Sequence, residues 1–110
     1  MAIVIADAFH AAANVNYPAP GAPAFDGSPN GFSEVLVRNG PGDFTLELDQ
    51  DLNVMDRTVH ATPYSGATVA IVTTEDVDDT HVRIRTFDAA GAALDNVPVS
   101  VGVWRHQIES

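Results

Sequence analysis

The sequence contains no cysteine and no lysine, and basic residues of any kind are scarce. The absence of cysteine excludes disulfide bonds and thiolate metal sites. Fifteen acidic residues against five basic ones, all five of them arginine, give a formal net charge of −10. Because neutralising phosphate groups requires clustered cations, this balance predicts no nucleic acid and no anionic membrane surface among the partners.

Long hydrophobic runs are also missing from the chain. No stretch approaches the ~20 apolar residues that a transmembrane helix needs. The first ten residues, MAIVIADAFH, are apolar but lack the basic n-region of a signal peptide, so we expect no secretion by that route. With 110 residues, 45% of them hydrophobic, the chain has the size and composition of one domain with one modest core.

The most unusual segment is residues 11–32, AAANVNYPAPGAPAFDGSPNGF, which is apolar yet holds four of the seven prolines. Each proline pushes the residue before it into extended geometry, and interleaved glycines interrupt regular structure. The segment is therefore predicted to be an extended arm, neither helix nor strand. The expected organisation is an N-terminal strand and Pro/Gly/Ala-rich arm at residues 1–31 and an antiparallel β domain at residues 32–110.

Short strands separated by turn signals are predicted from residue 32 onward. The strings SEVLVR and DFTLEL flank NGPG, whose Asn-Gly and Pro-Gly dipeptides favour a hairpin. The nearly all-apolar ATVAIVTT is predicted to be a central strand. The spacing indicates an all-β fold, an antiparallel β-sandwich or small barrel of about six to seven strands with an extended N-terminal arm. The strands expected after the arm are 33–38, 43–48, 55–62, 67–74, 80–87 and 97–105.

Alternation along these strands predicts which side chains face the core. In the hairpin, pairing Val37 with Phe44 places Val35 opposite Leu46. In the last strand Trp104 faces outward, and antiparallel pairing of the last two strands would bring it near Arg83 for a cation–π contact. The inward residues expected in the last two strands are Val82, Ile84, Thr86, Val97, Val99, Val101 and Val103.

Motifs for catalysis or metal binding are scarce. The four histidines fall in different predicted segments, and neither a G-x-S-x-G elbow nor a phosphate-cradling glycine loop occurs. Asp49, Asp51 and Asn53 have the one-three-five spacing of a calcium loop. However, Val54 stands where that loop needs glycine and His60 where it needs glutamate. We therefore predict that the chain is not an enzyme and that it has no catalytic residues, metal site or cofactor.

The arm implies a function based on contact area. Fixing each backbone residue costs about 1–2 kcal/mol, and an apolar arm recovers this cost only against a broad acceptor surface. A neighbouring subunit is the easier acceptor, so the arm and one sheet face are predicted to contact a partner. The residues expected to make this contact are Val15, Tyr17, Pro18, Pro20, Phe25, Phe32, Arg83 and Trp104.

Two longer strings, GFSEVLVRNGPGDFTLELDQDLN and VRIRTFDAAGAALDNVPVSVGVWR, resemble strings in small β-rich virion structural proteins of tailed bacteriophages. The resemblance spans residues 31–105 and carries over no functional residue. It implies a capsid decoration or cement protein, made in the host cytoplasm and placed on the capsid surface of the virion. The partners it implies are the major capsid protein and/or identical copies, in a homo-oligomer or bound to the lattice.

Two other functions remain open from the sequence. One is a receptor- or glycan-binding module of a tail fibre, for which Tyr17, Tyr64 or Trp104 would be exposed sugar platforms. The other is a hydrolase that uses clustered acidic residues. The first requires aromatic side chains in a groove, and the second requires two carboxylates that converge.

Overall fold

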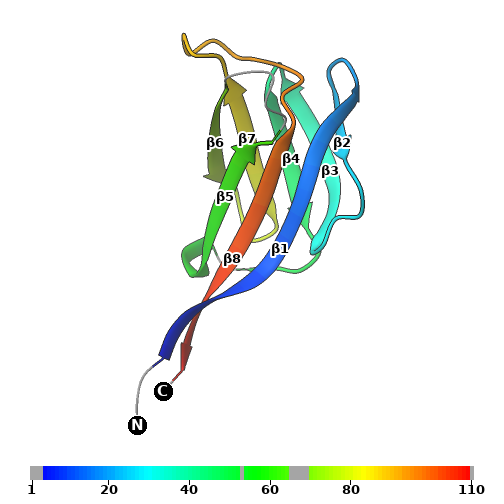
Figure 1. Ribbon diagram of the computed structural model, residues 1–110. Helices are drawn as coiled ribbons and strands as arrows, with labels where there is room; N and C mark the ends of the chain where they lie inside the picture. The colour runs from blue at the N-terminus through cyan, green and yellow to red at the C-terminus, as the bar shows by residue number, and fades with distance from the viewer. Residues whose placement is uncertain (1–3, 53, 65–69, 110) are drawn as a thin grey trace.

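Two antiparallel four-stranded sheets pack against each other in the computed structural model, which describes residues 4–52, 54–64 and 70–109 (Figure 1). Sheet A has the strand order β2-β1-β8-β5, and sheet B has the order β3-β4-β7-β6. The predicted β-sandwich is confirmed, with eight strands in these residues. The strands are β1 (Val4–Ala19), β2 (Ala22–Phe25), β3 (Phe32–Gly40), β4 (Asp43–Leu48), β5 (Arg57–Pro63), β6 (Ile71–Asp76), β7 (His81–Phe87) and β8 (Val99–Glu109).

The core lies between the two sheets and follows the predicted alternation. In β7, Val82, Ile84 and Thr86 are fully buried while their neighbours are partly exposed. The inward valines of 97–103 are at most 3% exposed. The largest buried side chain is Phe44 of β4, which lies across from β7. The apolar core consists of Ala11, Ala13, Val15, Phe32, Phe44, Leu46, Leu48, Leu52, Val82, Ile84, Val97, Val99, Val101 and Val103.

The prediction of an arm at residues 11–32 is wrong. Residues 11–15 continue β1 and pair with residues 99–103 of β8, and β2 pairs with β1 in turn. Ala11, Ala13 and Val15 belong to the core, so residues 1–31 do not form a part separate from the β domain. The physical reason is that the alternate apolar residues of AAANV fit the core face of a strand whose partner lies over 80 residues away in the sequence.

The proline-glycine signal at Pro20-Gly21 forms a tight turn instead of breaking the structure. Ala19 pairs with Ala22 across these two residues, and Gly21 has a φ of 73°. A turn with proline in its second position and a positive φ in its third takes glycine there. Pro23 follows in β2, which is an edge strand, where a missing N–H costs no ladder bond when it faces outward.

Two further strand predictions need correction. The β3–β4 hairpin does place Val35 opposite Leu46, but register shifts pair Phe44 with Arg38 in place of Val37. The strand predicted at 67–74 is not central: the described strand β6 begins at Ile71 and lies at the edge of sheet B, where Ile71 is 48% exposed. Residues 67–69 of that prediction lie outside the described residues.

Helical structure is limited to one turn. In the described ranges the only helix is the 3-10 turn η1 (Val54–Asp56), and none is long and apolar enough to cross a membrane. The expected loop at 88–96 is held by the Asp88 carboxylate, which accepts hydrogen bonds from the N–H groups of Ala90 and Ala92 at 2.9 and 3.0 Å.

Candidate binding surfaces

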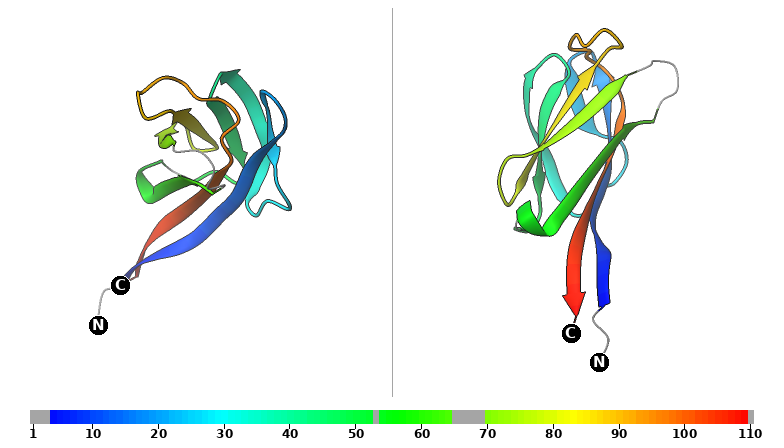
Figure 2. Two further views of the ribbon diagram at one scale, coloured as in Figure 1. Left: turned by 45° about the horizontal axis from the view of Figure 1, so that its top comes forward. Right: turned by 90° about the vertical axis from the view of Figure 1, so that its left-hand side faces the viewer.

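The longest strand pair of the fold continues past the sandwich. β1 and β8 stay paired to their ends, Val4 opposite Glu109, whereas β5 leaves β8 at Arg57, opposite Arg105. Within the described part of the chain, the backbones of residues 4–7 and 106–109 therefore pair only with each other, and we call these eight residues the terminal ribbon. Figure 2 shows this ribbon extending below the other strands, with both chain ends at its tip.

The terminal ribbon has two open edges. Among the described residues, no strand pairs with β1 on its outer side before Ala12, which forms an isolated bridge to Asn30. On the other side, no described strand pairs with β8 beyond Arg105, although the His106 imidazole lies 2.7 Å from the Thr58 hydroxyl of β5. An isolated two-stranded ribbon is marginally stable in water, and its unpaired N–H and C=O groups are a template for pairing with another chain. The backbone geometry therefore makes the ribbon the part of this fold best suited to a partner.

The predicted contact residues of the N-terminal segment lie mostly inside the protein. Val15 is fully buried and Phe32 is 3% exposed, so neither is available to a partner, and predicting them as contacts was wrong. Phe25 is partly buried with its ring 6.3 Å from that of Phe32. Tyr17 is half-buried with its ring edge-on to Phe44 at 6.5 Å, and burial raises the pKa of its hydroxyl to about 12. These aromatic residues hold the sandwich together.

Other predicted contact residues remain on the surface. Pro18 and Pro20 are exposed beside the β1–β2 turn, and Trp104 is 39% exposed on β8. Arg83 faces outward on β7 and forms ion pairs with Asp43 and Glu75.

The predicted contact between Trp104 and Arg83 is wrong. β7 pairs with β4 and β6 in sheet B, and β8 pairs with β1 and β5 in sheet A. The last two strands in sequence therefore lie in opposite layers of the sandwich. Both side chains point away from the core, so Trp104 and Arg83 lie on opposite faces of the molecule.

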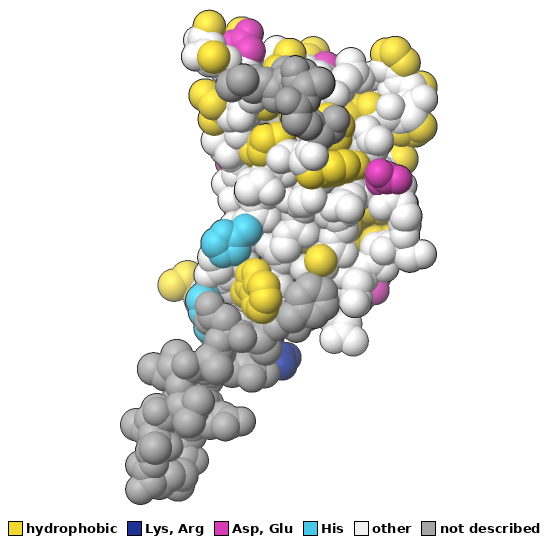
Figure 3. Space-filling view, viewed as in Figure 1, with side chains coloured by type: hydrophobic (Ala, Val, Ile, Leu, Met, Phe, Trp, Pro, Cys, Tyr) yellow, Lys and Arg dark blue, Asp and Glu magenta, His cyan; other side chains and the backbone are white. Residues whose placement is uncertain are grey.

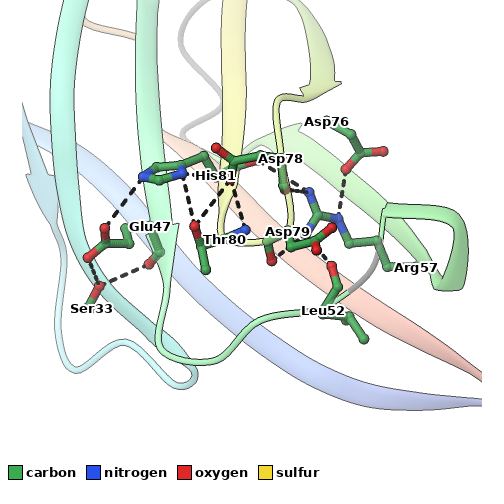
Figure 4. Close-up of polar contacts among 9 residues, drawn as sticks. All are labelled: Ser33, Glu47, Leu52, Arg57, Asp76, Asp78, Asp79, Thr80 and His81. Atoms are coloured by element: carbon green, nitrogen blue, oxygen red, sulfur yellow. Dashed lines mark hydrogen bonds and ion pairs between the residues drawn. The ribbon is translucent and has the colours of Figure 1, made fainter.

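A buried arginine closes the end of the sandwich from which the ribbon emerges (Figure 4). The Arg57 side chain is fully buried and pairs with Asp76, its Nε donating to the carboxylate at 2.8 Å. Its other nitrogens donate to four backbone carbonyl oxygens, those of Leu52, Asp78, Asp79 and His81, at 2.7 to 3.2 Å. This saturated set of bonds ties β5 to the two loops around it. No sequence pattern pointed to a role for Arg57.

Polar side chains beside Arg57 form a chain that could be mistaken for catalytic machinery (Figure 4). The His81 Nδ1 lies 2.7 Å from Asp78 and its Nε2 lies 3.4 Å from Glu47. The Ser33 hydroxyl, however, donates to Glu47 at 2.9 Å and not to the imidazole. Since a nucleophile needs its base within hydrogen-bond reach, this order of groups does not build a Ser-His pair.

The exposed carboxylate of Asp78 is held in its ionised form by the same network. Hydrogen bonds to its carboxylate lower the pKa of Asp78 to about 2, the largest contribution coming from the backbone N–H of Thr80 and the next from the His81 side chain. Within the described ranges no three His, Asp or Glu side chains are grouped to hold a metal ion. Asp49 and Asp51 are exposed, and Asn53 lies outside the described residues.

No protein-family model, curated protein or solved structure matches this chain.

Proposed function

We propose that this chain is a non-enzymatic structural protein of a tailed-phage virion, a decoration or cement protein that binds the major capsid protein through the terminal ribbon. The observation that carries the proposal is the ribbon itself, four residue pairs of β1 and β8 that continue beyond the sandwich with no further described strand paired to either edge. The resemblance of residues 31–105 to small virion proteins supports the choice of partner.

Pairing with a neighbour supplies what the ribbon lacks. Inside the sandwich, β1 and β8 each have strands or loops on both sides, and their apolar residues enter a shared core. Ordering a backbone residue costs about 1–2 kcal/mol, and backbone pairing alone offsets little of that cost in water. A strand of the capsid protein added to either edge would satisfy the open N–H and C=O groups and bury ribbon surface.

The charge of the protein favours a basic acceptor. With a net charge of −10 and only five arginines, the chain repels acidic surfaces and is attracted to cationic ones over distances of about a Debye length. The proposed capsid site is accordingly a basic surface that presents a strand edge, and binding weakens as salt concentration rises.

Co-sedimentation with capsids stripped of this protein tests the proposal. Successive residues of a strand direct their N–H groups to opposite edges. The two single variants Ile5→Pro and Ala6→Pro therefore each remove one N–H donor, from opposite edges of β1. At least one of them is expected to lose capsid binding while thermal unfolding stays near that of the wild type.

The matched control is Ala89→Pro, in the exposed turn after Asp88 at the opposite end of the molecule (Figure 1). Residue 89 follows Asp88 at a turn position that accepts proline. The Ala89→Pro variant should therefore bind capsids like the wild type. Full binding by both ribbon variants, or no binding by the wild type, would contradict the proposal.

A further inference from the structure

The outer face of sheet A carries a hollow of about 510 Å³. Its floor is made by small or short residues of the two central strands, Ala12 and Asn14 of β1 and Ser100 and Gly102 of β8. The connection from β2 to β3 forms one side, and β5 forms the other. In Figure 3 the middle of this face is mostly white, the colour of backbone and uncharged polar side chains, with hydrophobic side chains above and below it.

Polar side chains with unused hydrogen-bonding capacity line both sides of the hollow. Ser28 and Asn30 lie on the side of β2, and His60 and Thr62 lie on β5. All four side chains are exposed, and none forms a hydrogen bond or ion pair in the part of the chain that the structure describes. On the floor, the Ser100 hydroxyl donates to Asn14 at 2.6 Å, which fixes the orientation of both groups.

Two exposed aromatic residues do not line the hollow themselves but lie next to residues that do. Trp104 follows Gly102 on the outer side of β8, and its indole Nε1 would lie 3.8 Å from a Cβ added to that glycine. Tyr64 is 38% exposed, and its hydroxyl donates to Asp26 at 3.0 Å. Tyr64 follows β5 and Asp26 follows β2, the two edge strands, so this bond spans the face of sheet A.

We propose that this hollow binds a neutral oligosaccharide. A sugar ring presents an apolar C–H face and a rim of hydroxyl groups, which need an aromatic surface and uncharged donors and acceptors together. Trp104 supplies the aromatic surface, and Asn30, His60 and Thr62 supply hydrogen-bonding groups beside it. The site does not use the terminal ribbon, so it goes beyond the proposed capsid function and does not depend on it.

Charge and strand pairing argue against other ligands. No arginine lines the hollow, Asp26 is the one acidic residue in its lining, and the whole chain has a formal net charge of −10, so anionic ligands are repelled. An added protein strand is disfavoured because β1 and β8 are both central strands of sheet A and offer no free edge there. The uncharged hydroxyl groups of a neutral glycan meet neither obstacle.

The test starts with the full-length protein on an array of immobilised neutral, sialylated and sulfated glycans. A neutral glycan that binds is then titrated as the free oligosaccharide by calorimetry. Trp104→Ala is expected to weaken binding about three- to tenfold through loss of stacking. Gly102→Val should weaken it by at least about tenfold, because the added side chain occupies the floor of the hollow.

Gly102→Val is chosen because it should leave the fold intact. The added Cβ meets only the Trp104 indole at an ordinary contact distance, and valine is favoured in strands. Ile71→Ala is the matched control for Trp104→Ala, since Ile71 is 48% exposed on β6 of the other sheet and should bind glycan unchanged. Binding only to charged glycans, no binding at all, or full binding by both hollow variants would overturn the proposal.

Discussion

The same pair of strands behaves as two different structures along its length. At residues 11–15 and 99–103, β1 and β8 lie inside sheet A and bury six of the core residues. At residues 4–7 and 106–109 the same ladder continues, and no third strand of the described ranges pairs with it. The difference shows that backbone pairing alone does not define the stable part of this protein. Neighbouring strands and a shared core do.

Proline substitutions in β1 should show the largest difference between the two regions, measured as loss of the free energy of unfolding. The Ala12 N–H bonds to Asn30 at 2.8 Å on the outer side, so the N–H of Ala13 points to β8. Ala13→Pro removes a central ladder bond and should lower the free energy of unfolding by at least about 3 kcal/mol. Ala6→Pro in the ribbon should cost less than about 1 kcal/mol. Urea unfolding measures both, and equal losses would erase the distinction.

Removing Arg57 should produce the next largest effect, at the boundary between the two regions. Arg57→Ala removes the donor to Asp76 and to the Leu52 carbonyl, and it removes one of the donors to three further carbonyl groups that also accept backbone N–H bonds. It is expected to cost about 3–5 kcal/mol. Arg85→Ala is the control, because Arg85 has a 37% exposed side chain and one ion pair to Glu75 at 3.3 Å. It should cost about 0–1 kcal/mol. A small loss for Arg57→Ala would show that the closed end of the sandwich does not depend on this network.

A pH-dependent contribution of about 1 kcal/mol is expected from sheet B, away from the ribbon. The Arg83 Nε donates a hydrogen bond to the Asp43 carboxylate at 2.8 Å, and this bond lowers the pKa of Asp43 below its usual 3.8. Its stabilisation is thus present above about pH 4 and lost as pH falls through the lower folded-state pKa. The difference in unfolding free energy between wild type and Asp43→Asn should shrink toward zero in acid. A difference that grows in acid would refute this assignment.

The last prediction concerns Tyr17, which reports whether residues 11–32 are packed. Burial raises the pKa of Tyr17 to about 12, with a smaller contribution from the nearby charge of Asp95. The neutral hydroxyl therefore stabilises the folded state below pH 10, and this stabilisation is lost as pH rises from about 10 to 12. Ultraviolet titration of Tyr64→Phe isolates the Tyr17 signal. A midpoint near 10 under native conditions would mean that this segment is a free arm after all.

Local alternation made much of the sandwich predictable. The inward residues Val82, Ile84 and Thr86, and the valines of 97–103, follow from period-two patterns that hold whatever their partners are. The apolar run that ends in β6 carried no such pattern, and its edge position depends on strand order. The pairing of β1 with β8 was missed because it joins the two ends of the chain and leaves no local signal.

The candidate sites were less predictable than the core. Pro20-Gly21 was interpreted as a break in regular structure, although the same dipeptide at 41–42 was interpreted as a turn. Only the pairing of Ala19 with Ala22 shows that Pro20-Gly21 is a turn as well. Trp104 was expected on an outer face, as observed, but the pairing of Thr58 with Trp104 and of His60 with Gly102 depends on tertiary structure. Arg57 needed the positions of four carbonyl groups, which no sequence pattern provides.

Native-state hydrogen exchange of the isolated full-length chain tests the central claim most directly. Amides of residues 11–15 that bond within sheet A should exchange as slowly as those of the inward valines of β8, at rates set by global unfolding. Amides of residues 4–7 and 106–109 should exchange orders of magnitude faster. Equal protection of both regions, or fast exchange throughout residues 4–19, would contradict the account.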